Sequence, residues 1–209
     1  MKRSSLNLLL LSFLLLTGCT LVTVRTLEED RIAKEGFSAE NYVNSIWESD
    51  FLPTLEENAV EIGHLLSEID ADEDTATEQY GNRTSTGPYS FMAQGEAKIL
   101  NVDRESRVGL AHLDLQPYDS EVDIYLAIGP VLRGNALRDA VGFIAFNDFT
   151  NQVEFAQVSD ALKERADVEV LTPFGVDERI GQTIRFLGAF TLDDRNEIVI
   201  MPVRLEVIE

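Results

Sequence analysis

Residues 129–152 decide the fold of this chain and read Gly-Pro-Val-Leu-Arg-Gly-Asn-Ala-Leu-Arg-Asp-Ala-Val-Gly-Phe-Ile-Ala-Phe-Asn-Asp-Phe-Thr-Asn-Gln. The stretch combines a Gly-Pro turn, two arginines and a polar and aromatic run from Phe146 to Asn151. Alternating strand patterns precede it, and a short helical pattern followed by further strands comes after it. We therefore predict that these residues form the crossover that closes a small β-barrel.

Three strands are predicted before the crossover, at residues 89–99, 108–115 and 122–128. Each alternates apolar and polar side chains, which is the period of a half-buried strand. Gly95 lies inside the first run and predicts a bulge or bend there.

After the crossover, residues 151–165 predict a helix, and residues 180–190 and 199–207 predict two more strands. Pro202 lacks a backbone N–H and predicts an edge strand or a bulge. Five strands with a helix between strands 3 and 4 are the arrangement of an OB-fold, whereas a sandwich would need about seven strands. We therefore predict an α+β fold in which residues 89–209 form a five-stranded OB-like β-barrel domain.

Residues 38–88 are predicted to form an N-terminal helical hairpin and an acidic linker. Ser38 is a suitable N-cap, and Pro53 either ends the first helix or lies in the first turn of the second. Two apolar stripes have helical spacing. They are Tyr42, Val43, Ile46 and Trp47, and then Leu55, Ala59, Ile62, Leu66 and Ile69.

The linker carries alternate aspartates at Asp70, Asp72 and Asp74, as at the start of a calcium loop. Such a loop needs Gly at its sixth and Glu at its twelfth position, where this chain has Thr75 and Gly81. A solvated acidic segment is the better interpretation. We predict no metal and no cofactor.

The N-terminus predicts export. Lys2 and Arg3 precede an apolar run at residues 6–16, which is too short to cross a hydrocarbon core of ~30 Å. It has the dimensions of a signal peptide. The Leu-Thr-Gly-Cys that ends at Cys19 resembles the bacterial lipobox, which implies cleavage before Cys19 and its acylation.

We therefore predict that residues 1–18 are a lipoprotein signal peptide and residues 19–37 a lipid-anchored tether. Cys19 is the only cysteine, so no intramolecular disulfide is possible. Acyl chains at Cys19 would hold the protein stably on a membrane, facing the periplasm. Thr20, where proteins kept in the inner membrane have Asp, favours the outer membrane.

The net charge excludes one class of partner. The chain has a formal charge of −20, and loss of residues 1–18, with two basic and no acidic residues, brings it to −22. Nucleic-acid binding depends on Lys and Arg that neutralise phosphates, so we predict no nucleic-acid partner.

Several segments resemble the DUF2291 family of predicted periplasmic lipoproteins. The resemblance implies an OB-like fold, a lipid-anchored periplasmic location and an accessory role beside sugar-type ABC importers; it brings no catalytic residues. The matching segments are residues 128–144 and 146–153, Gly188-Ala-Phe190, Pro202-Val-Arg-Leu-Glu206, Tyr42, Val43, Trp47 and Tyr89-Ser-Phe91.

The crossover holds the candidate binding or structural network. Arg133 and Arg138 are able to present two guanidinium forks to a carboxylate or to hydroxyls, and Asp139 to pair with either. The remaining polar side chains suit capping of the next helix. An internal network that fixes the crossover is the default use of such residues, and a ligand site is the alternative. The full set is Arg133, Asn135, Arg138, Asp139, Asn147, Asp148 and Asn151.

Three functions remain open. The first is a non-enzymatic accessory or adaptor lipoprotein of a sugar-type ABC import system, with a periplasmic sugar-binding protein or permease as partner. The second is direct binding of a small carbohydrate, for which Trp47, Tyr125 and the other tyrosines offer stacking faces, although core packing explains these residues equally well. The third, an uncharacterised hydrolase, is least favoured, because nucleophile, zinc and phosphate-loop motifs are missing. Neighbouring acids such as Asp193 and Asp194 lie in segments predicted to be exposed, unlike a glycosidase pair.

The lipobox interpretation has a direct test. We expect labelled fatty acid to be incorporated into the wild-type protein and not into Cys19→Ala, because the acylated sulfur is then missing. Label on the variant would contradict the assignment.

Overall fold

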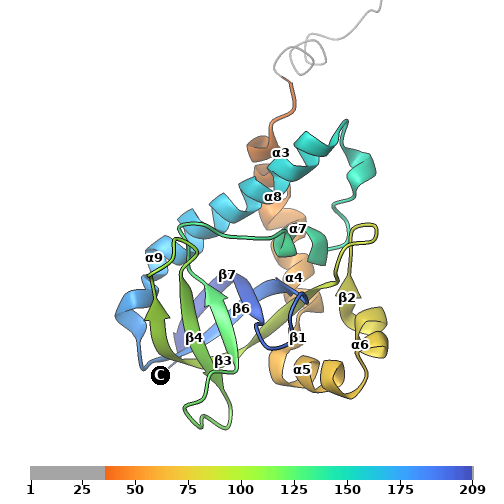
Figure 1. The fold of residues 1–209 in the computed structure, drawn as a ribbon. Helices are drawn as coiled ribbons and strands as arrows, with labels where there is room; N and C mark the ends of the chain where they lie inside the picture. The colour runs from red at the N-terminus through yellow and green to blue at the C-terminus, as the bar shows by residue number, and fades with distance from the viewer. Residues whose placement is uncertain (1–35, 209) are drawn as a thin grey trace, which may run out of the picture. The chain divides into compact units, whose positions relative to one another are not determined.

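The computed structural model describes residues 36–208, of which residues 38–208 belong to one compact unit. The predicted signal peptide, Cys19 and almost all of the tether lie outside the described residues. Within the described part, runs of helices and runs of strands form an α+β fold (Figure 1). Among residues 36–208, no helix is both long and apolar enough to cross a membrane.

The centre of the fold is a seven-stranded sheet. Its strands are β1 (Val60–Glu61), β2 (Gly81–Asn82), β3 (Ser90–Asp103), β4 (Leu110–Leu115), β5 (Ile124–Ala127), β6 (Thr183–Thr191) and β7 (Val199–Ile208). The five longer strands pair in the order β3-β4-β5-β7-β6, and β6 pairs again with β3, so that their path closes. The β5–β7 pair is parallel, whereas the other pairs along this path are antiparallel.

The prediction of five strands was therefore incomplete. The two additional strands are only two residues long, which is too short to show a period in the sequence. β1 pairs with β3 at Ala93 and Gln94, and β2 pairs with it at Ser90 and Phe91. They cover the edge of β3 that β4 leaves unpaired, because β4 begins to pair only at Ala97. Backbone groups on that edge thus find partners.

Gly95 does not mark a bulge, which is one of the two alternatives predicted for it. It pairs in regular register with Phe186, and the irregularity of β3 lies between Ile99 and Asn101. The glycine is needed for close packing, because a Cβ at this position would lie 2.7 Å from Cγ2 of Ile62. At Pro202 the predicted bulge is confirmed, since the register of β7 shifts opposite Gly188.

The N-terminal helices are more than a hairpin. The first run consists of α3 (Ala39–Ile46), a π-helical turn η1 (Trp47–Phe51) and α4 (Leu52–Asn58), followed by α5 (Ile62–Ala71) and α6 (Glu73–Tyr80). Ser38 caps α3 as predicted, since its Oγ accepts from the Asn41 N–H at 3.2 Å. The stripe from Leu55 to Ile69 is not one helix, because the chain extends at Ala59 to form β1.

The segment predicted to be an acidic linker is helical over α6. Asp72 caps this helix by accepting from the Thr75 N–H at 3.2 Å and from its hydroxyl at 2.7 Å. The pKa of Asp72 lies below its usual value, chiefly because its carboxylate accepts the hydrogen bond from the Thr75 hydroxyl. Ala76 and Thr77 are buried, which gives this largely polar helix a packed side.

Six helical segments lie between β5 and β6 in the chain. They are α7 (Ala136–Ala140), η2 (Phe146–Asp148), α8 (Gln152–Ala166), η3 (Asp167–Leu171), α9 (Thr172–Phe174) and η4 (Val176–Arg179). The predicted helix at residues 151–165 is confirmed as α8, which packs beside α3 (Figure 1). The barrel interior is filled by buried side chains that include Phe91, Leu113, Ile124, Phe186 and Ile200.

Candidate functional site

Arg138 of the crossover is directed into the protein. It lies on α7 and is only 6% exposed. Its Nε donates to Oδ1 of Asp139 at 2.8 Å, and its Nη1 donates to the Phe155 carbonyl oxygen at 3.1 Å. The guanidinium also lies 3.7 Å from the centre of the Phe155 ring. Asp139 accepts a second bond from the Thr84 hydroxyl at 2.8 Å, so this ion pair joins the crossover to the segment before β3.

The remaining predicted residues of this set mostly serve local structure. Asn151 caps α8 by accepting from the N–H groups of Val153 and Glu154 at 2.9 and 3.0 Å. Asp148 accepts from the Ala145 N–H at 3.1 Å. Asn135 accepts from the Ser159 hydroxyl on α8 at 2.9 Å, and Asn147 is exposed.

Arg133 is separated from this network. It is exposed and lines a pocket of about 270 Å³ on the outer side of β4, β5 and β7. The pocket has an apolar floor that includes Leu110, Ala127, Val199 and Met201, whereas its charged residues are Arg133, Asp193, Asp194 and Glu197. The two arginines that the sequence suggested as paired forks therefore have different surroundings.

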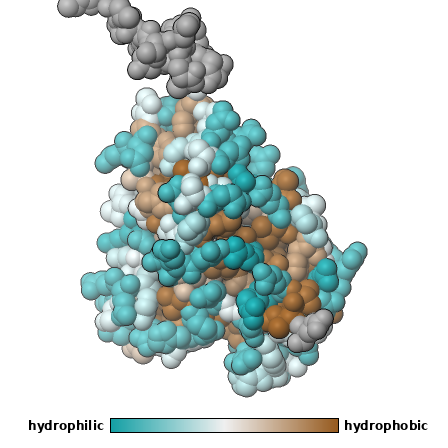
Figure 2. Space-filling view, turned by 180° about the vertical axis from the view of Figure 1, so that it is seen from behind, coloured by the Kyte–Doolittle hydropathy of each residue, from teal (hydrophilic) through white to brown (hydrophobic). Residues whose placement is uncertain are grey.

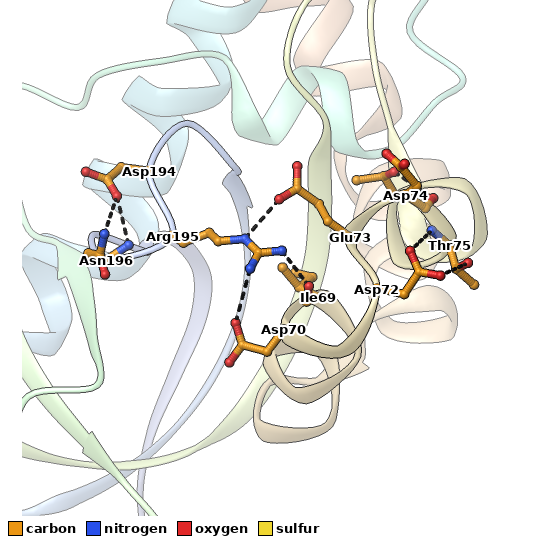
Figure 3. Close-up of polar contacts among 10 residues, drawn as sticks. Ile69, Asp70, Asp72, Glu73, Asp74, Thr75, Asp194, Arg195 and Asn196 are labelled. Carbon is orange, nitrogen blue, oxygen red and sulfur yellow. Dashed lines mark hydrogen bonds and ion pairs between the residues drawn. The ribbon is translucent and has the colours of Figure 1, made fainter.

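The acidic side of the pocket belongs to the β6–β7 loop, which Arg195 attaches to the N-terminal helices (Figure 3). Nε of Arg195 donates to Oε2 of Glu73 at 2.9 Å, and Nη2 donates to the carbonyl oxygen of Ile69 at 2.6 Å. Nη1 lies 3.7 Å from Oδ1 of Asp70. Because Arg195 follows directly after Asp194, this attachment positions the carboxylates at the pocket.

A second arginine fixes the start of the crossover. Nη1 of Arg104, in the β3–β4 loop, donates to the carbonyl oxygens of Ile128 and Gly129 at 3.1 and 2.8 Å. The rest of its guanidinium forms a two-pronged pair with Asp177, at 3.0 and 2.6 Å. The hydrogen bond from Arg104 lowers the pKa of Asp177, and the same bond raises the pKa of Arg104.

Two aromatic side chains lie on the same face of the strands as the pocket floor, although they are not among the residues that line the pocket. Leu110 pairs with Ala127, and His112 pairs with Tyr125 two residues further along the same strands. Residues two apart share a face of a strand, so Tyr125 and His112 lie on the pocket side of the barrel. Their rings meet edge to face with centres 5.2 Å apart, and Tyr125 also pairs with Val199 of β7.

A second hollow has a larger volume, about 490 Å³, but it is less suited to a ligand than the pocket beside Arg133. It is lined by Glu61, Gln94, Glu96, Arg185 and neighbouring residues. These groups already have protein partners: Arg185 pairs with Glu96 at 2.6 Å, Glu61 accepts from the His64 N–H, and Gln94 donates to the Ala59 carbonyl. Within residues 36–208, no group of three or more His, Cys, Asp or Glu could hold a metal ion.

Sequence reasoning missed Arg104 and Arg195, which hold the two loops beside the pocket. Neither is part of a periodic pattern or a motif, because each acts on residues far away along the chain. Asp193 and Asp194 are exposed, as the sequence predicted, but it gave no sign that they face the same pocket as Arg133.

Comparison with known proteins gives a family and a fold. A family model described as "Predicted periplasmic lipoprotein (DUF2291)" matches residues 9–206. The chain is also similar to the crystal structure of an OB-fold protein from Thermotoga maritima, with a TM-score of 0.69 and 18% identity over 83% of this chain and 99% of that one. At this identity the likeness shows the fold alone, and it confirms the OB-fold. No curated protein matches the chain.

The two crossover arginines are expected to differ in their effect on stability. Arg138→Ala should lower the free energy of unfolding by about 3–5 kcal/mol, since it leaves the partly buried Asp139 without its cation. Arg133→Ala should change it by less than about 0.5 kcal/mol, as at other exposed positions. Urea unfolding of both variants measures this difference. Equal losses would show that Arg133 belongs to the internal network after all.

Proposed function

The chain belongs to the DUF2291 family of predicted periplasmic lipoproteins, and from this premise we propose that it is a non-enzymatic, lipid-anchored protein that binds a small carbohydrate at the barrel pocket. The observation that supports the proposal is the arrangement of that pocket. An apolar floor lies beside an aromatic ring, and one arginine and three carboxylates stand at its margin.

Carbohydrates have the chemistry that such a site recognises. Their ring C–H groups favour apolar and aromatic surfaces, and Tyr125 offers one next to Val199. Their hydroxyls donate to the carboxylates of Asp193, Asp194 and Glu197 and accept from Arg133. At Asp194 the acceptor is Oδ2, because Oδ1 already accepts from the backbone and side-chain N–H groups of Asn196 at 2.9 and 3.1 Å. A pocket with an apolar lining and a few placed polar groups is typical of small-molecule sites.

The pocket's position supports the same proposal by analogy. OB-folds use the face of strands 2 and 3, with the adjoining loops, for oligosaccharides and oligonucleotides. Those strands correspond here to β4 and β5, and the β6–β7 loop borders them. Three carboxylates against one arginine repel phosphates, so we propose a neutral or amino sugar rather than a sugar phosphate or nucleic acid. We place the anchor at Cys19 in the outer membrane, because Thr20 follows it.

Binding can be measured with a panel of neutral and amino sugars by calorimetry. We expect one class to bind, and the double variant Asp193→Asn and Asp194→Asn to weaken its affinity at least about tenfold, since hydrogen bonds to charged groups contribute about 1.5–3 kcal/mol. Arg133→Ala should weaken it as well. Arg185→Ala, which removes a similarly exposed ion pair at the other hollow, is the matched control. Equal loss in the control, or no binding sugar, would refute the pocket assignment.

A second function is supported by a different surface. A groove of about 400 Å³ lies between α4, η3, α9 and β7, with Leu52, Val170, Phe174 and Leu205 among its apolar residues. The view from behind shows apolar side chains gathered between hydrophilic margins (Figure 2). Such patches favour protein partners. We propose that this groove contacts a periplasmic sugar-binding protein or permease, so that the lipoprotein acts as an adaptor of a sugar-type ABC importer.

Photo-crosslinking in the native cell envelope tests the adaptor role. A photoreactive residue in place of Leu205 should capture a sugar-binding protein or permease, identified by mass spectrometry. The same residue in place of Glu78 on α6, which is exposed and does not line the groove, should not. Recovery of the lipoprotein alone from both variants would argue against the adaptor and leave sugar binding as the function.

A further inference from the structure

Exposed apolar side chains are concentrated between α7 and the first turn of α8. Of the seven large hydrophobic residues that are exposed in the described part of the chain, three fall within eleven consecutive positions. These are Phe143, Phe146 and Val153, which are 38%, 44% and 65% exposed. We refer to Phe143, Phe146 and Val153 as the apolar wedge.

The wedge is held by a buried aromatic cluster. The Phe146 ring meets the Phe155 ring edge to face at 5.6 Å, and Phe149 lies 5.5 Å from the same ring. Arg138 stacks on Phe155 from within the protein. The backbone around Phe146 is fixed by the Asp148 side chain, which accepts from the Ala145 N–H. Phe146 is therefore held in place by its ring contact and by the fixed backbone around it.

The wedge also lies beside the point at which the chain leads back to Cys19. Phe149, in the same segment, contacts Tyr42 in the first turn of α3 with ring centres 5.3 Å apart. Figure 1 shows the start of α8 at the same end of the molecule as the start of α3. Between Cys19 and Ser38 the chain can span at most about 65 Å. An acylated Cys19 thus keeps the start of α3 within that distance of the membrane, so that the wedge is able to reach the lipid surface.

We infer that the apolar wedge is a second membrane contact, which inserts into the interface of a zwitterionic lipid surface and sets the orientation of the barrel. Aromatic and branched apolar side chains favour the boundary between headgroups and acyl chains. Because the tether already links the protein to the membrane, the wedge meets lipid at a high effective concentration. A weak affinity of the wedge for lipid is then sufficient to keep it in contact with the surface. Asp148 and Glu154 next to the wedge are repelled by anionic headgroups, which is why the zwitterionic surface is specified. The inference rests on the lipid anchor and is independent of the sugar pocket.

Depth-dependent fluorescence quenching tests the contact in the full-length, lipidated protein. The variant Phe146→Trp is reconstituted into vesicles of phosphatidylcholine and phosphatidylethanolamine whose acyl chains carry bromine, a contact quencher. Val153→Trp reports from the first turn of α8 at a more exposed position, in case the Phe146 ring is needed for folding. Ile180→Trp is the matched control, because Ile180 is 52% exposed but lies beside the end of β3, next to Gly181 and its bond to the Ile99 carbonyl. Trp47, the one native tryptophan, is buried and gives all variants the same background.

We expect brominated lipid to quench the emission of F146W and V153W several-fold more than that of I180W, and added phosphatidylglycerol to reduce the difference. Equal quenching in all three variants would show that the anchor alone holds the protein at the membrane without a preferred face. Absence of quenching at both wedge positions would equally overturn the inference, and shielding of the same positions only in native envelopes would assign the wedge to a protein partner instead.

Discussion

The double pairing of β3 is the constraint on which the rest of the structure depends. Its first half pairs with β6 and its second half with β4, and the two ladders overlap at Ala97 and Lys98. One strand therefore belongs to both sides of the barrel and closes it, which removes exposed edges among the longer strands. Gly95 in this strand leaves room for Ile62 of α5 to pack against it.

Closure of the barrel also creates the candidate site. β5 joins β7 in parallel, so that Ala127, Val199 and Met201 of the two strands form a floor with Arg133 on one side and the β6–β7 loop on the other. Each side is then fixed by one arginine that donates to backbone carbonyl oxygens, Arg104 to those of Ile128 and Gly129, and Arg195 to that of Ile69. Guanidinium groups suit this task because their several N–H donors bind a carbonyl and a carboxylate at once.

Some residues of the crossover are buried and stabilise the fold, whereas others are exposed at the surface. Arg133 precedes α7 and faces solvent at the pocket, whereas Arg138 lies on α7 and is enclosed by Asp139, Phe155 and the Phe155 carbonyl. Burial of an arginine is costly unless its charge and donors are satisfied, and here a carboxylate, a carbonyl and a ring do so. The same enclosed arginine supports the aromatic cluster beneath the apolar wedge, so the pocket and the wedge are joined through one short helix.

The sequence by itself determined what local chemistry can determine. It predicted the export and lipidation signals, and it located the Ser38 cap, the helix after Asn151, the five longer strands and the bulge at Pro202, because each depends on neighbouring residues or on a short period. It also carried the family resemblance. The prediction failed at two places. At Ala59 the chain becomes extended and β1 interrupts an apparent helical stripe. At residues 73–80 an acidic run is helical, because Asp72 caps the helix and Ala76 is buried. Only the tertiary structure decided which arginine is buried and that Asp193, Asp194 and Arg133 share one pocket. The shared pocket depends on loops that meet although Arg133 and Asp193 are 60 positions apart in the sequence, and the burial of Arg138 depends on which side of a short helix faces the core. Neither leaves a pattern in the linear sequence.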